Sequence, residues 1–104
     1  MTQPTINSLT SKLLKDIKDT FSAFPNVKTV ILYGSRATDD YEETSDIDLA
    51  VSGPHITDLE MTQIKNALEK IHTILKFDVT HFENITKQSL KEDITNEGIC
   101  LYES

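Results

Sequence analysis

The sequence predicts a small α/β domain of the α+β type, in which a mixed sheet is flanked by helices. The chain of 104 residues is long enough for one domain, which we place at residues 1–104. Apolar residues recur at helical spacing in three segments of the chain. Short segments rich in β-branched and aromatic residues alternate with these helical segments, which favours a sheet whose strands are connected through helices.

The first helix and the first strand are predicted before residue 34. From Asn7 or Ser8, either of which is a good N-cap, apolar residues repeat every three or four positions up to Pro25. The segment 27–33 (VKTVILY) then ends in an uninterrupted apolar run. Such a run predicts an inner strand covered on both faces, and Gly34 ends it.

A loop, a second strand and a second helix follow. Residues 36–45 are polar and acidic, and residues 46–51 (DIDLAV) alternate charged and aliphatic side chains before becoming apolar. We interpret them as a loop and a strand. Thr57 and Glu60 have the spacing of a capping box, and the apolar stripe that follows predicts a helix to about Leu75.

Two more strands and one more helix complete the predicted fold. Residues 77–82 (FDVTHF) predict a third strand, residues 86–96 a last helix closed by Gly98, and residues 99–102 a short fourth strand. Cys100 lies in that apolar strand and is predicted to belong to the core.

Composition excludes several classes of function. Seventeen acidic residues against ten basic ones give a net charge of −7, which disfavours a nucleic-acid partner. The three glycines are too far apart for a dinucleotide-binding site or a P-loop, and the three histidines match no usual zinc pattern. The chain has no stretch that could span a membrane and no signal peptide, and its single cysteine suits a reduced environment, so we expect a cytoplasmic protein.

The stretch that carries chemistry begins with two aspartates. Residues two apart in a strand point to the same face, so Asp46 and Asp48 are expected to present their carboxylates side by side. Two such carboxylates repel each other unless a divalent cation lies between them, and Mg²⁺ accepts a few carboxylates together with phosphate oxygens. The alternative is a pair of solvated acids at the end of a strand.

Gly34, Ser35 and Arg36, at the junction between the first strand and the acidic loop, supply groups that can bind a phosphate. Gly34 directly follows a hydrophobic strand and allows a ligand close to the backbone, while Ser35 offers a hydroxyl and backbone N–H groups. Arg36, the only arginine, is a candidate to neutralise phosphate charge or to pair with Asp39 or Glu43. An ordinary turn glycine and a helix-capping serine are the alternatives.

Taken together, Gly34-Ser35, ten further residues and Asp46-x-Asp48 resemble the GSx10DxD signature of minimal nucleotidyltransferases in the DNA polymerase β superfamily. The resemblance extends from about residue 27 to residue 102. It implies a third acid on a later strand, and Asp78 occupies that place. Asp78 alternates with apolar neighbours, so it is expected on the face that carries the other two acids, the alternative being a surface aspartate.

The resemblance also implies an activity. Two Mg²⁺ ions held by Asp46, Asp48 and Asp78 would serve the transfer of AMP from ATP, with Gly34, Ser35 and Arg36 contacting the nucleotide. In the antitoxin-like branch of this family, the acceptor is a tyrosine of a HEPN-type toxin subunit, an RNase. Two alternatives stay open, namely an antitoxin that neutralises its toxin by binding alone and an aminoglycoside-type enzyme with a small-molecule acceptor.

Overall fold

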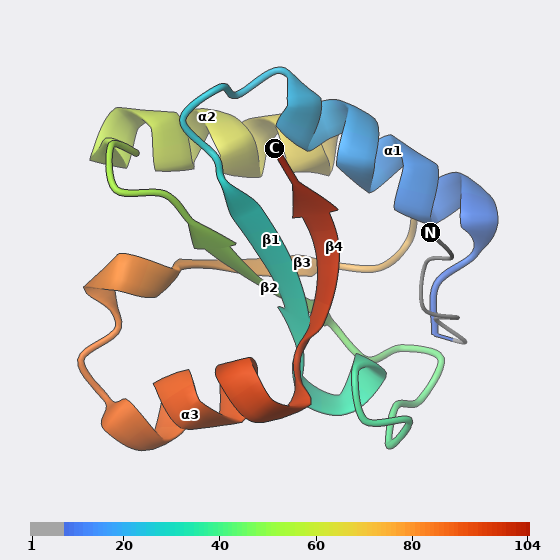
Figure 1. The fold of residues 1–104 in the computed structure, drawn as a ribbon. Coiled ribbons are helices and arrows are strands. Elements are labelled where there is room, and N and C mark those ends of the chain that lie inside the picture. The colour runs from blue at the N-terminus through green and yellow to red at the C-terminus, as the bar shows by residue number, and fades with distance from the viewer. Residues whose placement is uncertain (1–7) are drawn as a thin grey trace.

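A computed structural model describes residues 8–104. A four-stranded sheet, in the order β3-β2-β1-β4, lies between α1 and α2 on one side and α3 on the other (Figure 1). The predicted element order is confirmed, with two additional 3₁₀ turns. The elements are α1 (Ser11–Ser22), β1 (Thr29–Tyr33), η1 (Gly34–Arg36), β2 (Ile47–Ser52), α2 (Asp58–Glu69), β3 (Phe77–His81), η2 (Phe82–Asn84), α3 (Gln88–Glu97) and β4 (Ile99–Glu103).

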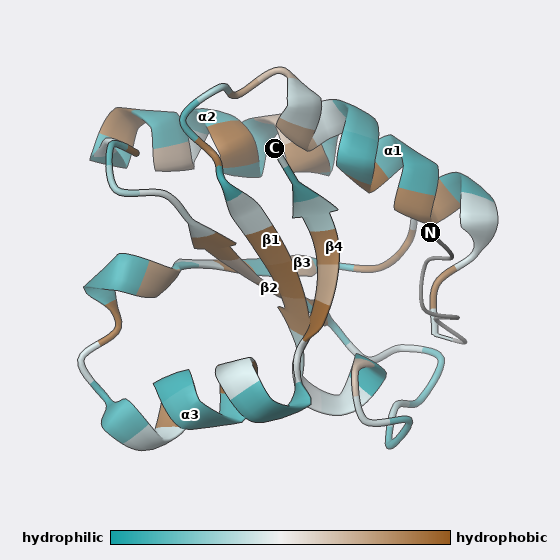
Figure 2. Cartoon of the chain, viewed as in Figure 1, coloured by the Kyte–Doolittle hydropathy of each residue, from teal (hydrophilic) through white to brown (hydrophobic). Residues whose placement is uncertain are grey.

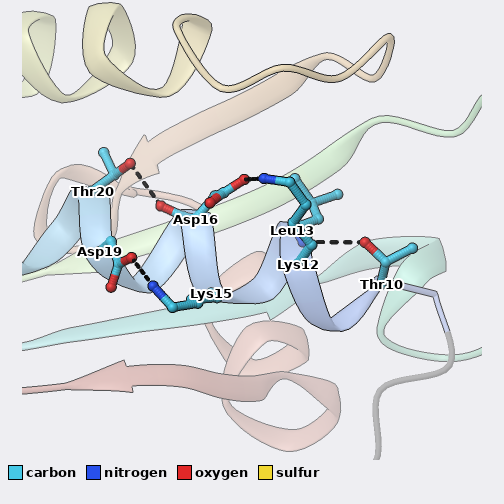
Figure 3. Close-up of polar contacts among 7 residues, drawn as sticks. All are labelled: Thr10, Lys12, Leu13, Lys15, Asp16, Asp19 and Thr20. Atoms are coloured by element: carbon cyan, nitrogen blue, oxygen red, sulfur yellow. Dashed lines mark hydrogen bonds and ion pairs between the residues drawn. The ribbon is translucent and has the colours of Figure 1, made fainter.

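The helix α1 begins later than the sequence suggested. Thr10 is its N-cap, because its hydroxyl accepts a hydrogen bond from the Leu13 N–H (Figure 3). The prediction of Ser8 as the cap is wrong because its hydroxyl instead donates to the carbonyl of Arg36; Asn7 lies outside the described residues. The exposed side of α1 carries the ion pairs Lys12–Asp16 and Lys15–Asp19, one turn apart, also drawn in Figure 3.

The helix α2 has the predicted capping box but ends at Glu69, not near Leu75. Lys70 is its C-cap, and Ile71 and Leu75 pack against the core from the connection to β3. Apolar residues spaced by three or four fit a helix and a turn that folds back over the same core equally well. The length of α2 was therefore overestimated.

Smaller differences occur in the last third of the chain. β3 ends at His81, and Phe82 belongs to η2. Gly98 closes α3 as predicted, and its N–H donates to the Ile94 carbonyl. Cys100 is exposed on the edge strand β4, so the prediction that it belongs to the core is wrong.

The sheet is mixed, as predicted, and β1 is one of its inner strands. β1 pairs antiparallel with both β2 and β4, whereas β2 and β3 are parallel. A parallel pair needs a crossover connection, and α2 provides it.

The two faces of the sheet differ in how completely they are covered. The face under α1 and α2 packs a large apolar cluster, which includes alternate residues of β1 and β2 such as Leu32, Ile47 and Leu49. The opposite face has a smaller cluster around Ala50, Ile85 and Ile94, packed under α3. Figure 2 shows the apolar strands between the mostly polar outer surfaces of the helices. Within residues 8–104, no helix is both long and apolar enough to cross a membrane.

Candidate active site

The carboxylates of interest lie on the less covered face, where β1 ends and β2 and β3 begin. Asp48 is directly opposite Asp78 in the parallel β2–β3 pair and directly opposite Tyr33 in the antiparallel β1–β2 pair. Since Ile47 and Val79 are buried on the α1–α2 side, strand alternation places Asp48 and Asp78 on the α3 side. The predicted juxtaposition of these two aspartates is confirmed.

The electrostatics of Asp48 reflect this crowding. Partial burial raises the pKa of its carboxyl above the ordinary value, and the negative charges of Asp78 and then Asp46 raise it further. Within residues 8–104, no Lys, Arg or His forms an ion pair with any of these three aspartates. The Asp48 carboxylate is therefore held within range of two other carboxylates, with no protein cation in the described part of the chain paired to offset their charge.

Asp46 is placed less tightly than its two partners. It is exposed and lies one residue before β2 begins. In residues 8–104, no three His, Cys, Asp or Glu side chains form a group ready to hold a metal ion. The structure thus presents Asp48 and Asp78 as a facing pair, with Asp46 adjacent.

Gly34 makes room for the Asp48 carboxylate. Its φ is +75°, a conformation that L side chains rarely adopt, and a Cβ at this position would collide with Asp48 Oδ2. The next residue, Ser35, is half-buried in η1, and its carbonyl accepts a hydrogen bond from the Asp40 N–H at 3.1 Å. The predicted Gly-Ser turn therefore lies against the carboxylate pair.

Arg36 has a different role from the one predicted. Its residue is only 4 % exposed, and its guanidinium donates to the backbone carbonyls of Ser8, Glu42, Glu43 and Ser45. The ring of Tyr41 covers the guanidinium at 5.2 Å. The prediction of a carboxylate partner for this side chain is wrong, because its donors bind backbone carbonyls of the loop that leads to Asp46. The phosphate contact stays a prediction.

Tyr33 and Thr80 were missed by the sequence analysis. The two side chains interact across β2, because Tyr33 lies on β1 and Thr80 on β3 and both are on the face that carries Asp48. Burial raises the pKa of the Tyr33 hydroxyl. The Thr80 side chain lowers this pKa, and the negative charges of Asp48 and Asp78 raise it, so the net shift is upward. The tyrosine before Gly34 was visible in the sequence, but only the strand register reveals its neighbours.

The donor chemistry fits Mg²⁺. This ion prefers carboxylate oxygens and binds one or two of them together with phosphate oxygens. Asp48 and Asp78 supply carboxylate oxygens that face each other, and they repel each other without a cation between them. Asp46 is near enough for its charge to act on Asp48 and is a candidate third ligand.

Comparison with known proteins places the chain in a family. Residues 15–104 match the model of the family Polymerase beta, Nucleotidyltransferase. The chain belongs to this family. Among curated proteins, none matches the chain.

Solved nucleotidyltransferase structures share the fold. A structure of a minimal nucleotidyltransferase has a TM-score of 0.68 at 25 % identity, over 85 % of this chain and 91 % of its own. A toxin–antitoxin complex with AMP-PNP also has a TM-score of 0.68, at 18 % identity over 88 % of this chain and 73 % of that one. A nucleotidyltransferase from Sulfolobus solfataricus has a TM-score of 0.56 at 22 % identity, covering 88 % and 78 %. The resemblance to minimal nucleotidyltransferases is confirmed.

Proposed function

We propose that this nucleotidyltransferase transfers AMP from ATP to a tyrosine hydroxyl of a HEPN-type toxin, and that it acts as the antitoxin of that toxin. The observation that carries the proposal is the Asp48–Asp78 pair beside the Gly34-Ser35 turn. Acidic side chains without a counter-charge destabilise a fold. The presence of two of them next to a turn that a ligand can approach therefore favours a catalytic role.

The proposed reaction assigns a task to each residue. The acceptor oxygen forms a bond to the α-phosphorus, and the bond from that phosphorus to the pyrophosphate oxygen breaks. Gly34 lets the triphosphate approach the backbone, and the Ser35 hydroxyl donates to a phosphate oxygen. Asp78 lies on an edge strand and is exposed, so its carboxylate is placed to receive the proton of the acceptor hydroxyl.

Asp46, Asp48 and Asp78 are the residues that would hold two Mg²⁺ ions. When bound, these ions supply positive charge for the α-phosphate, the acceptor oxygen and the leaving pyrophosphate. The same charge would remove the repulsion between Asp48 and Asp78.

The partner assignment is supported by one of the structural neighbours and by the size of the domain. One neighbour of the same fold is a toxin–antitoxin complex that contains AMP-PNP. The described residues form one sheet with three main helices, and the carboxylate pair lies on an open face rather than in an enclosed acceptor pocket. An acceptor brought by a second protein suits such an open site.

The test combines the protein, Mg²⁺, ATP and the product of the neighbouring gene as the candidate toxin. ATP labelled at the α-phosphate should label the toxin, whereas ATP labelled at the γ-phosphate should not. Intact mass should show the gain of AMP, and peptide mapping should place it on tyrosine. Label from the γ-phosphate would instead indicate phosphoryl transfer and contradict the proposal.

Two matched variants control this test. Asp48→Asn should lower the transfer rate by a factor of about 100 or more, because it removes a metal ligand worth several kcal/mol in the transition state. Glu83→Gln makes the same chemical change at the opposite end of β2 and should leave the rate within about twofold. Toxin neutralised without any label would favour an antitoxin that acts by binding, and an aminoglycoside labelled without the toxin would favour the small-molecule enzyme.

A further inference from the structure

We infer that the outer edge of β3 is the docking site for the acceptor, and that the partner adds an extended segment to the sheet there. This inference deepens the proposed function and rests on it for the identity of the partner. It starts from the position of β3, which ends the sheet in residues 8–104 and carries Asp78.

The backbone of β3 has groups free to pair with another strand. The Ile47 N–H donates to the Lys76 carbonyl. In the parallel β2–β3 pair, the even-numbered residues of β3, Asp78 and Thr80, therefore direct their backbone N–H and C=O groups toward β2. The N–H groups of Phe77, Val79 and His81 and the C=O groups of Phe77 and Val79 therefore point outward, whereas the His81 C=O accepts the first bond of η2. Within residues 8–104, β3 pairs with β2 alone, and no bond from a turn or loop reaches the outward groups.

Adjoining hollows, together called the groove, follow this edge. One hollow of about 210 Å³ is lined by Phe77, Asp78 and Val79 together with Lys65 and Glu69 of α2. A second, of about 420 Å³, is lined by Val79, Thr80 and His81 together with residues of α2 and η2. The two hollows share Lys65 and Val79, so all five residues of β3 line the groove.

The groove continues past the start of β3 into an apolar hollow. This third hollow, of about 310 Å³, includes Leu68, Ile71, Leu75 and Phe77 among its lining residues. It shares Glu69 and Phe77 with the hollow that contains Asp78. The hollow that adjoins the one containing Asp78 therefore offers a place for an apolar side chain of the partner.

A charged group in the groove lacks a partner. The ammonium of Lys65 has no ion pair within residues 8–104. The side chain of His81, by contrast, is only 10 % exposed, and its Nε2 lies 3.2 Å from both the Gly53 carbonyl and the Glu83 carboxylate. A partner that supplies an acidic residue would therefore pair with Lys65.

The geometry of an added strand explains how the acceptor hydroxyl reaches the carboxylates. Side chains of paired residues lie about 5 Å apart at Cβ on the same face. A partner tyrosine opposite Asp78 therefore lies beside that carboxylate, on the face that carries Asp48. Its two neighbours in the segment point to the α2 side, toward Lys65 and the apolar hollow.

The other edge of the sheet is less suited to an added strand. The pairing of β4 with β1 shifts register between Val30 and Ile31, whereas β3 pairs with β2 in unbroken register over five residues. Irregular edges hinder strand addition, and regular ones invite it. The regular edge is also the one that carries a site aspartate.

The decisive experiment follows amide hydrogen exchange by NMR in the protein alone and with a saturating amount of the candidate toxin. The amides of Phe77, Val79 and His81 should exchange at least about tenfold more slowly in the complex. Asp78 and Thr80, already paired with β2, should change little, and the amides of β4 serve as the control edge. A complex that leaves Phe77, Val79 and His81 unprotected would overturn the inference.

Two charge reversals on α2 provide a kinetic test. Lys65→Glu should raise the KM for the toxin about tenfold with little change in kcat, because it affects docking and not the reacting groups. Lys70→Glu, on the same helix but outside the three hollows, should change KM less than twofold. Equal effects of the two variants would contradict a role for the groove.

The outcomes separate this inference from the proposed function. Transfer of AMP without protection of the β3 amides would overturn the docking site and leave the function standing. Protection without transfer would support the docking site and contradict the enzymatic role. Absence of any complex with the toxin would overturn both.

Discussion

The two ends of the β2–β3 pair place carboxylates in opposite circumstances. At one end, Asp48 faces Asp78 with no counter-charge, and burial together with neighbouring negative charge raises its pKa. At the other end, Glu83 accepts hydrogen bonds from the Ser52 hydroxyl at 2.7 Å and the Gly53 N–H at 3.2 Å. Burial alone would raise the pKa of Glu83, but these hydrogen bonds and the nearby His81 lower it.

This difference distinguishes an acid that stabilises the fold from one that serves a reaction. Glu83 connects η2 to the turn after β2, and its charge is satisfied within the chain. Asp48 lowers stability as long as it is ionised and alone. A structural carboxylate, on η2, thus lies at one end of this pair of strands and a candidate catalytic one at the other, and the two differ in their partners.

The largest effect on stability is expected at Arg36. Its guanidinium is held by carbonyls of the loop and so does not pair with the Asp48 carboxylate. Arg36→Met should lower the free energy of unfolding by about 3 kcal/mol, because four backbone carbonyls lose a charged donor in a buried site. Urea denaturation measures this loss, and Arg36→Lys should show a smaller one. Wild-type stability of Arg36→Met would refute the structural role of this residue.

A second prediction concerns the turn that accommodates Asp48. Gly34→Ala should lower the free energy of unfolding by about 2 kcal/mol, since alanine is strained at a positive φ and its Cβ displaces the Asp48 carboxylate. The neighbouring Ser35→Ala should cost less than about 0.5 kcal/mol. Thermal unfolding of both variants tests the contrast, which fails if they are equally stable.

The contrast between the Asp48 and Glu83 carboxylates is tested by replacing each of them with its amide. Glu83→Gln should lower the free energy of unfolding at pH 7 by about 1 kcal/mol, a modest value because the side chain is 39 % exposed. Asp48→Asn, without metal, should instead raise it by less than about 1 kcal/mol, because the repulsion disappears. A loss of stability in both variants would show that Asp48 is structural as well.

The smallest expected effect is on the pH dependence of stability without metal. Because the pKa of Asp48 is raised in the folded protein, its protonated carboxyl contributes to the free energy of unfolding. This contribution is fully present below the pKa of the unfolded chain and is lost as the pH rises through the pKa of the folded protein. The lowered pKa of Glu83 has the opposite effect. The contribution of its ionised carboxylate to the free energy of unfolding is present above the pKa of the unfolded chain and is lost as the pH falls through the pKa of the folded protein. Denaturation between pH 3 and 7 should show each slope disappear in the corresponding amide variant.

Much of the fold could be predicted from local patterns, because each strand and helix has its own apolar periodicity. The face on which Asp78 lies, shared with Asp48, could be predicted from alternation along the strand and is confirmed, whereas the register that puts the two residues opposite each other could not. Arg36 could not be predicted correctly, since its acceptors include the carbonyl of Ser8, 28 residues away. Tyr33 and Thr80 were missed because their proximity depends on the register of three strands.

The parallel arrangement of β2 and β3 has a consequence for the order in which the site forms during folding. Gly34 directly follows β1 and Asp48 lies on its antiparallel neighbour β2, so the two residues can meet as soon as β1 and β2 close their loop. Asp78 reaches Asp48 only after α2 has folded back across the sheet. Because closure of the longer connection costs more chain entropy, we expect the Gly34 turn to form early and Asp78 to reach its place late. A folding intermediate with β3 undocked would therefore have the Gly34 turn and the first two aspartates, but neither the third aspartate in place nor the edge to which an acceptor strand could be added.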